Sequence, residues 1–334
     1  MSQDIRPPLA PMARRRFLQG AAGAASLAAW PGSAKAETYP SRPVRLIVGS
    51  VPGAAPDVVA RLIAQSLSQR LGQPVVVENR NGASGNLATE MVARAAPDGY
   101  TLLLISASNA INTSLYHDLN FNFVRDIVPI GGVVAFPMVI TVRPAFAAAT
   151  LPELIAAAKA RPGKINIGTP PIGSPQHVAG ELLKMQTGAD IQFVAYSGGP
   201  PAITDALGGQ TDGVIGTVLL LIDFIRSGKL RALAVTGTKP SPLLPDVPTV
   251  ASVVPGFEAS QWIGLGAPKG TPEEVVGKLN AGIEAALAEA DFQKRLTALG
   301  GSPLPGSAAD FGAYVAGEAA KWRKVVIFAK LKPE

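Results

Sequence analysis

Ser174 and His177 are the pair of residues whose types and spacing come nearest to covalent chemistry. They stand three positions apart at the start of a predicted helix, where a serine nucleophile and a histidine base could share one face. A hydrolase of this kind also needs an acid that orients the histidine, and the sequence offers no obvious one. An exported Ser/His hydrolase is therefore kept only as an alternative, which turnover of an ester would test.

The sequence also lacks the residues and motifs that other enzyme classes require. The chain has no cysteine and only two histidines, which excludes thiol catalysis, cysteine-ligated metals and a multi-histidine metal site. The G-x-S-x-G, G-x-x-x-x-G-K-[ST] and G-x-G-x-x-G motifs of hydrolases and nucleotide-binding proteins do not occur. Four carboxylates have no spacing that would pair them as acid and base: Asp57, Glu78, Glu181 and Asp205. We predict that the protein is not an enzyme and uses neither a cofactor nor a metal.

Four loops rich in glycine, serine and threonine suggest a different chemistry. Each follows a predicted strand and precedes a predicted helix: 49–57, 81–86, 169–174 and 196–200. In parallel α/β sheets ligands bind at the carboxyl ends of the strands, where backbone N–H groups approach closely and helix N-termini favour negative charge. The loops therefore predict an anion held by backbone and hydroxyl donors, with ordinary tight turns as the alternative for any loop taken alone.

Apolar runs and helical periodicity alternate along the chain after the first forty residues. Strands are predicted at 44–48, 75–77, 101–105, 133–142, 165–168, 192–195, 214–215, 230–235 and 262–267. Helices are predicted at 58–71, 86–95, 151–160, 174–185, 201–207, 219–225, 272–289, 292–299 and 309–329. This alternation indicates an α/β protein with parallel sheets that carry helices on both faces.

Composition excludes several further classes. A length of 334 residues suits two domains, and 47% apolar against 16% charged residues excludes disorder. With 35 glycines and 30 prolines, long coiled helices are also excluded. The net charge of +6 is concentrated in residues 1–36, where five basic residues stand against Asp4, so the rest of the chain is nearly balanced. We therefore predict no nucleic-acid binding.

The first 36 residues have the order of an export signal. The basic run Arg14-Arg15-Arg16-Phe17-Leu18 precedes an apolar stretch at 20–30 and a small-x-small site ending at Ala36. The apolar stretch is shorter than the roughly 20 residues that cross a bilayer. We predict a twin-arginine-type signal peptide at 1–36, cleaved near Ala36, and a periplasmic protein. A basic disordered tail is the alternative.

Ordered motifs run along most of residues 39–330: 39–48, Pro52-Gly53 with Asp57, 71–80, 97–103, Gly173-Ser174-x-x-His177, Tyr196-x-Gly198, 245–249 and 267–272. So many motifs in this order make a chance match unlikely. In these motifs the chain resembles a known family, the extracytoplasmic solute-binding proteins of tripartite tricarboxylate transporters, often called the Bug family.

The resemblance implies a clamshell like that of type II periplasmic binding proteins, with two doubly wound lobes joined by two crossing strands. The expected lobes are 37–138 plus 263–334 and 139–262, and the expected crossings are 133–142 and 262–267. It also implies hinge closure over a small organic carboxylate. The implied partners are integral membrane permease subunits, with a free-standing sensor as the alternative, and a monomer is usual for the family.

By position, the family's ligand loops correspond to twelve residues of this chain: Val51, Pro52, Gly53, Ala54, Asp57, Ser106, Asn109, Thr169, Gly173, Ser174, His177 and Tyr196. The sequence departs from the family pattern in these loops. Ala54 stands where a second glycine is usual, Pro170-Pro171 remove two donor N–H groups, and Ser197 replaces a common lysine. Gly216 stands where an acid that could pair an ammonium is often found. A receptor for a neutral or aromatic compound is therefore kept as an alternative.

Overall fold

The computed structural model describes residues 38–333. The predicted signal peptide at 1–36 and its cleavage near Ala36 lie outside these residues. The described residues from Arg42 onward form one compact unit. Every helix and strand of the described residues belongs to this unit.

Ten strands form one continuous sheet in the described residues, in the order β2-β1-β3-β9-β4-β7-β5-β6, with β8 and β10 also paired to β4. Their bounds are β1 Val44–Val48, β2 Val75–Asn79, β3 Thr101–Ser106, β4 Ile127–Val142, β5 Ile165–Thr169, β6 Ile191–Ala195, β7 Gly213–Thr217, β8 Arg231–Val235, β9 Ser260–Pro268 and β10 Ser302–Pro303. Strands β1, β2 and β3 are parallel, as are β5, β6 and β7. The sheet is mixed, because β9 runs antiparallel to β3 and β4 runs antiparallel to β7, β8 and β9.

Most helices follow the strands in the alternation that the sequence predicts, but the helices at 107–115 and 123–126 were not predicted. Their bounds are α2 Ala55–Leu71, α3 Asn86–Ala93, α4 Ala107–Leu115, α5 Phe123–Asp126, α6 Leu151–Ala160, α7 Pro175–Thr187, α8 Gly199–Leu207, α9 Val218–Arg226, α10 Glu273–Leu287, α11 Ala290–Ala298 and α12 Ala308–Ala329, with 3-10 turns η1 Ala83–Gly85 and η2 Val250–Ser252. None of these helices is long and apolar enough to cross a membrane.

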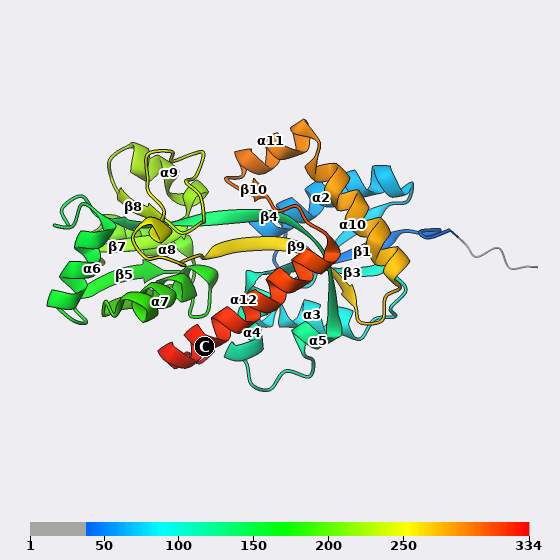
Figure 1. Ribbon diagram of the computed structural model, residues 1–334, viewed down its shortest axis with the longest axis horizontal. Coiled ribbons are helices and arrows are strands. Elements are labelled where there is room, and N and C mark those ends of the chain that lie inside the picture. Colours follow the sequence, from blue (N-terminus) through cyan, green and yellow to red (C-terminus); the bar gives the residue numbers. More distant parts are fainter. Residues whose placement is uncertain (1–37, 334) are drawn as a thin grey trace, which may run out of the picture. The chain divides into compact units, whose positions relative to one another are not determined.

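Strands β4 and β9 run from one lobe to the other (Figure 1). β4 pairs with β9 as far as Pro137 and then pairs with β7 from Met138 onward. Proline has no N–H to donate, so it fits the position where the strand exchanges one neighbour for another. Thr236, which directly follows β8, ties that strand to β4, because its Oγ1 accepts the Met138 N–H at 2.9 Å and its N–H donates to the Met138 carbonyl at 2.9 Å.

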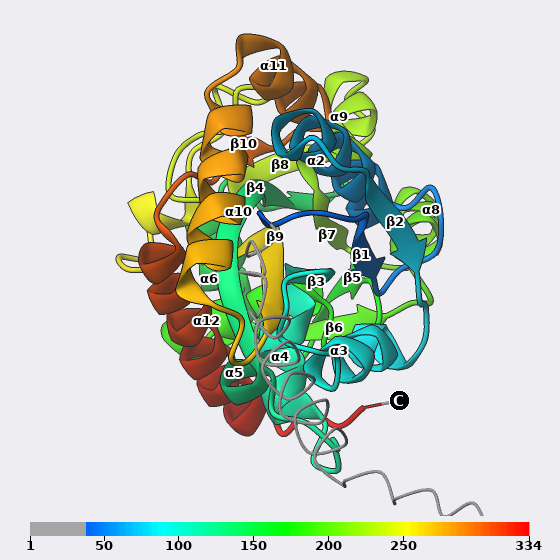
Figure 2. The same cartoon turned by 90° about the vertical axis from the view of Figure 1, so that its right-hand side faces the viewer.

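Helices cover both faces of the sheet in the first lobe (Figure 2). Helices α2 and α10 pack together on one face, while α3, α4 and α12 pack on the other. In the second lobe, successive residues of β7 pack against helices on opposite faces of the sheet. Val214 belongs to a hydrophobic cluster with residues of α8 and α9, and Ile215 belongs to another with residues of α6 and α7. A strand with helices on both faces is a continuous apolar run, as the sequence shows.

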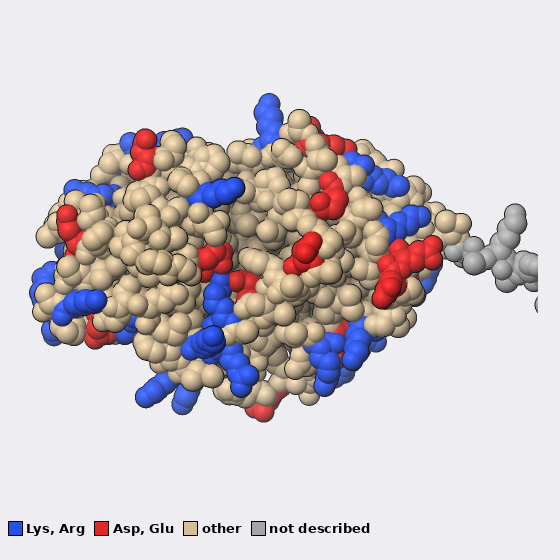
Figure 3. Space-filling view, in the orientation of Figure 1, with Lys and Arg blue, Asp and Glu red and all other residues tan. Residues whose placement is uncertain are grey.

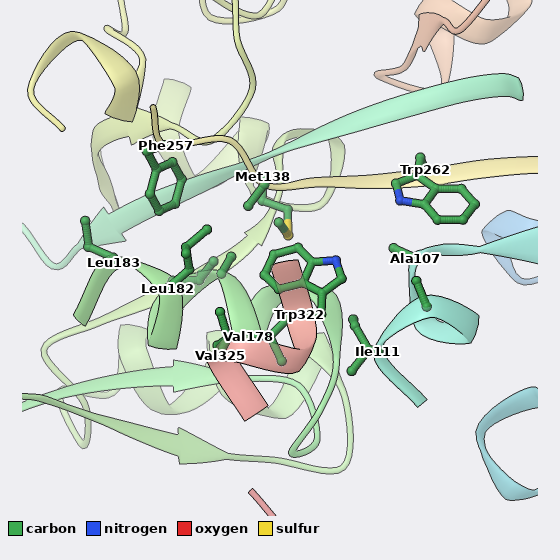
Figure 4. Packing of buried hydrophobic residues seen from close by; sticks show 14 of the residues in the cluster. Ala107, Ile111, Met138, Val178, Leu182, Leu183, Phe257, Trp262, Trp322 and Val325 are labelled. Atoms are coloured by element: carbon green, nitrogen blue, oxygen red, sulfur yellow. The ribbon is translucent and has the colours of Figure 1, made fainter. Parts of the chain in front are cut away.

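The C-terminal helix α12 ties the crossing strands to helices of both lobes. Its Trp322 is fully buried and lies near Met138 of β4, Ile111 of α4 and Val178 of α7 (Figure 4). Glu318 of the same helix has a side chain that is only 4% exposed. Its Oε2 accepts the indole N–H groups of Trp322 and of Trp262 in β9, each at 3.0 Å.

Candidate functional site

A cavity of about 270 Å³ opens at the carboxyl ends of β1, β2, β3 and β5. The loops that follow these strands surround it, and each leads into a helix: α2, η1 with α3, α4 and α7. These are three of the four loops that the sequence analysis names, together with the β3–α4 junction. The fourth loop, at 196–200, does not line the cavity.

The lining combines small polar residues with an apolar wall. The polar or small members are Gly49, Ser50, Ser84, Gly85, Ser106, Ser108, Asn109, Asn112, Gly173 and Ser174. The apolar members are Val48, Pro56, Leu103, Leu104, Leu115, Pro171, Ile172 and Pro175.

No charged side chain belongs to this lining. Acidic and basic side chains are instead scattered over the outer surface, as on the face in Figure 3. Three helices begin at the cavity: Pro56 lies in the first turn of α2, Ser106 caps α4 and Ser174 caps α7. Unsatisfied N–H groups at a helix start carry about half a positive charge, so the convergence of these ends favours an anion.

The β1 and β2 loops approach each other closely at the cavity. A Cβ atom on Gly49 would lie only 2.8 Å from the Gly85 Cα, so only glycine permits this contact. The turn before α3 is strained, since Ala83 and Ser84 both have left-handed φ values of 47° and 53°. Strained backbone of this kind persists only where the surroundings hold it, and it is common at binding sites.

Ser50 supplies a free hydroxyl at this edge of the cavity. Its Oγ is buried and has no hydrogen-bond partner among the described residues. Its carbonyl is fixed, because it accepts the Asn79 side-chain N–H at 3.0 Å. A buried hydroxyl without a partner is costly for a folded protein, so Ser50 has an unmet hydrogen bond beside the cavity.

Asp57 is buried behind the first loop and is fully engaged there. Its oxygens accept hydrogen bonds from Arg61 at 2.9 and 3.0 Å, from the Gly53 N–H at 2.9 Å and from Asn79 at 2.9 Å. Arg61 contributes most to lowering the pKa of Asp57 to about 2, and the Gly53 and Asn79 bonds add to the effect. Asp57 is therefore a carboxylate across the physiological range, and it does not line the cavity.

Two asparagines of α4 line the cavity while holding its frame. Asn109 Oδ1 accepts the Ser106 N–H at 2.7 Å and its Nδ2 donates to Thr89 Oγ1 at 2.8 Å. Asn112 Nδ2 donates to the Ser84 carbonyl at 3.1 Å and to Asn86 Oδ1 at 3.0 Å. These bonds fix α4 to the β2 loop and to α3, and so hold this part of the lining together.

Ser174 and His177 do not form a nucleophile–base pair. Ser174 Oγ accepts the backbone N–H of His177 at 3.2 Å, as an N-cap residue does. His177 Nδ1 instead accepts the Gly173 N–H at 3.5 Å. Burial lowers the pKa of His177 to about 4, so its ring is neutral near pH 7. This geometry gives the hydrolase alternative no support.

The structure brings together four of the twelve residues that the sequence predicts for the ligand. Ser106, Asn109, Gly173 and Ser174 line the cavity. The others lie outside the lining: Val51, Pro52, Gly53, Ala54, Asp57, Thr169, His177 and Tyr196. Val51–Gly53 are exposed at the loop tip, Thr169 is buried, and the Tyr196 hydroxyl donates to Asp205 at 2.8 Å. Ligand contacts of all twelve stay a prediction.

Several lining residues were missed by the sequence reasoning. Ser50 and Ile172 lie in two loops that were predicted to bind the ligand, at 49–57 and 169–174, but neither residue was among the predicted contacts. Ser108 and Asn112 could have been found from the helical spacing after β3, since residues in the first turns of a helix flank its N-terminus. No pattern marks Leu103 as a lining residue, because a buried strand reads the same whether or not it borders a cavity.

Two doubly wound lobes, two crossing strands and a cavity at strand ends define a periplasmic-type solute-binding protein. Residues 59–331 match the model of the tripartite tricarboxylate transporter family receptor. The chain belongs to this family, as the motifs predict, and the family consists of solute-binding receptors, not enzymes.

Related sequences and solved structures are similar to this protein over most of its chain. Protein BugT of Bordetella pertussis is 39% identical over 302 residues, which are 89% of this chain and 93% of BugT. An R. palustris protein solved with adipate is 34% identical, with a TM-score of 0.74, over 89% of this chain and all of the other. MatC from Rhodopseudomonas palustris, solved with bound malate, is 32% identical, with a TM-score of 0.70, over 86% of this chain and all of the other.

Proposed function

We propose that this receptor captures a small dicarboxylic acid with a largely apolar chain in the 270 Å³ cavity. The observation that carries the proposal is a lining without charged side chains, on which the N-termini of several helices converge. Adipate and malate in the two R. palustris structures support the same class of ligand. The volume lies just below the roughly 300–1,000 Å³ of drug-sized pockets, which favours a small metabolite.

The lining also argues against an amino acid as ligand. An ammonium group would need a carboxylate or several carbonyl acceptors, and no acidic residue lines the cavity. The wall that includes Leu103, Leu104 and Leu115 suits a methylene chain better than a heavily hydroxylated one. A neutral or aromatic ligand would leave the helix N-termini at the cavity without an anion.

The receptor would act in the periplasm as a monomer and deliver its ligand to integral membrane permease subunits. The basic and apolar order of residues 1–36 supports export, and membership of a transporter receptor family supports the permease. We also propose lobe boundaries at 138/139 and 262/263, supported by the change of strand partners in β4 between Pro137 and Met138.

Calorimetric titration of ligand-stripped protein tests the proposal. Adipate, succinate and malate should bind with micromolar or tighter affinity, because each charged hydrogen bond contributes about 1.5–3 kcal/mol before association costs. Ser50→Ala should weaken binding by about tenfold, whereas Ser114→Ala, on α4 but outside the lining, should not. Binding of a neutral aromatic compound with no response to any diacid would overturn the ligand class.

A further inference from the structure

We infer that Asp57 and His177 are a matched pair of positioning residues, each of which holds the backbone N–H of the glycine at the tip of its own cavity loop. Both were predicted to contact the ligand, yet neither lines the cavity. The inference deepens the proposed function and rests on it for the identity of the site. It assigns these side chains to the shape of the two loops instead of to the ligand.

In the first lobe the contact is short and well supported. Asp57 is the third residue of α2 and is only 2% exposed. Its Oδ2 accepts the Gly53 N–H at 2.9 Å, and its Oδ1 accepts from Asn79 at 2.9 Å. Because Asn79 also donates to the Ser50 carbonyl, one network fixes both ends of the Ser50–Gly53 segment.

In the second lobe His177 occupies the equivalent place. It is the third residue of α7 and is only 4% exposed, with Phe193 edge-on to its ring at 6.3 Å. Its Nδ1 accepts the Gly173 N–H at 3.5 Å, which is long for a hydrogen bond and makes this contact the weaker of the two. Gly173 itself lines the cavity and touches the other lobe, since a Cβ there would lie 2.3 Å from Leu115 Cδ2.

The two contacts have the same local geometry. In each case a glycine with left-handed φ, 81° for Gly53 and 78° for Gly173, lies four residues before the acceptor side chain. In each case the acceptor stands in the first turn of the helix and reaches back beyond the N-cap residue. The same chemistry occurs away from the cavity at the start of α12, where Asp310 Oδ2 accepts the Ser307 N–H at 3.2 Å.

A positioned loop makes binding less costly. A loop that already has its bound shape does not lose conformational freedom when the ligand arrives, so affinity rises without a new contact. The helix N-termini that face the cavity can act together only if Gly53 and Gly173 keep their loops in place. The pair therefore sets affinity while touching no atom of the ligand.

The test uses matched variants of the full-length receptor. H177N keeps an acceptor near the original Nδ1 position, whereas D57E and H177Q move the acceptor by about one bond. Amide hydrogen exchange at Gly53 and Gly173, read by NMR without ligand, should accelerate at least tenfold at the affected glycine in D57E and H177Q only. Affinity for adipate should fall about tenfold in these two variants and stay within threefold in H177N and the control D310E.

The outcomes separate this inference from the proposed function. Expected exchange rates with no adipate or malate binding in any variant would support the positioning roles and refute the ligand class. Diacid binding by the parent protein with equal exchange and equal affinity in all variants would overturn the inference. If D57E or H177Q does not fold, amide exchange in the parent protein decides: Gly53 and Gly173 should both be protected, and exchange at the rate of an unprotected amide at either glycine would refute that contact.

Discussion

Acidification from pH 7 to pH 4 should destabilise this protein through His177. Burial lowers the pKa of its imidazole to about 4, against 6.5 for the unfolded chain. Between these two pKa values His177 is protonated in the unfolded state but not in the folded state, so the free energy of unfolding falls as the pH falls. Each tenfold change in proton affinity is worth about 1.4 kcal/mol, so the loss approaches about 3 kcal/mol at pH 4 and levels off below it.

Urea unfolding followed by circular dichroism at several pH values from 7 to 4 measures this loss. The comparison is with H177N, which does not titrate, so that other groups cancel. Burial raises the pKa of Glu181, one turn further along α7, and this gives an opposite dependence that both proteins share. Asp57, with a pKa of about 2, titrates below the window. Equal slopes for the parent protein and H177N between pH 6.5 and 4 would refute the reasoning.

Three substitutions test the packing around the site and the crossing strands. Gly213→Ala should cost about 3 kcal/mol or more in urea unfolding, because its Cβ would lie 2.0 Å from the Thr141 carbonyl oxygen in the β4–β7 ladder. Gly173→Ala should weaken adipate binding about tenfold in calorimetry, because its φ of 78° is strained for alanine and its Cβ would clash with Leu115. Glu318→Ala should cost about 2–5 kcal/mol and shift tryptophan fluorescence, because two buried indole N–H groups lose their acceptor.

Most helices and strands could be predicted because local rules determine them. Helix α6 spans Leu151–Ala160 as predicted, with Thr150 as its N-cap. Helix α2 begins around Pro56 and ends before Gly72, whose φ of 69° suits only glycine well. In such segments the apolar pattern, the caps and the breakers agree, so sequence alone is sufficient.

The beginning of β4 could not be predicted. Its first six residues include Pro129, Gly131 and Gly132, which locally favour a loop, and the expected strand therefore started at residue 133. Pairing with β9 overrides this preference, and the register shifts next to the same residues are the local cost. The short β10 was missed for a different reason, because two residues carry no periodicity.

The candidate site was predictable at the level of loops but not of atoms. The rule that ligands bind at strand ends correctly selected the segments around Gly49, Ser84 and Gly173. It could not show that Asp57 and His177 accept hydrogen bonds from Gly53 and Gly173 of their own loops. That depends on side-chain geometry within one helical turn.

The uncharged lining of the cavity has a consequence for the salt dependence of binding. Salt screens exposed charges that lie more than about 8 Å apart at 0.15 M, whereas contacts inside a cavity are screened much less. Because the lining has no charged side chain that would attract a diacid over a longer distance, the affinity of this receptor should change little as the salt concentration rises.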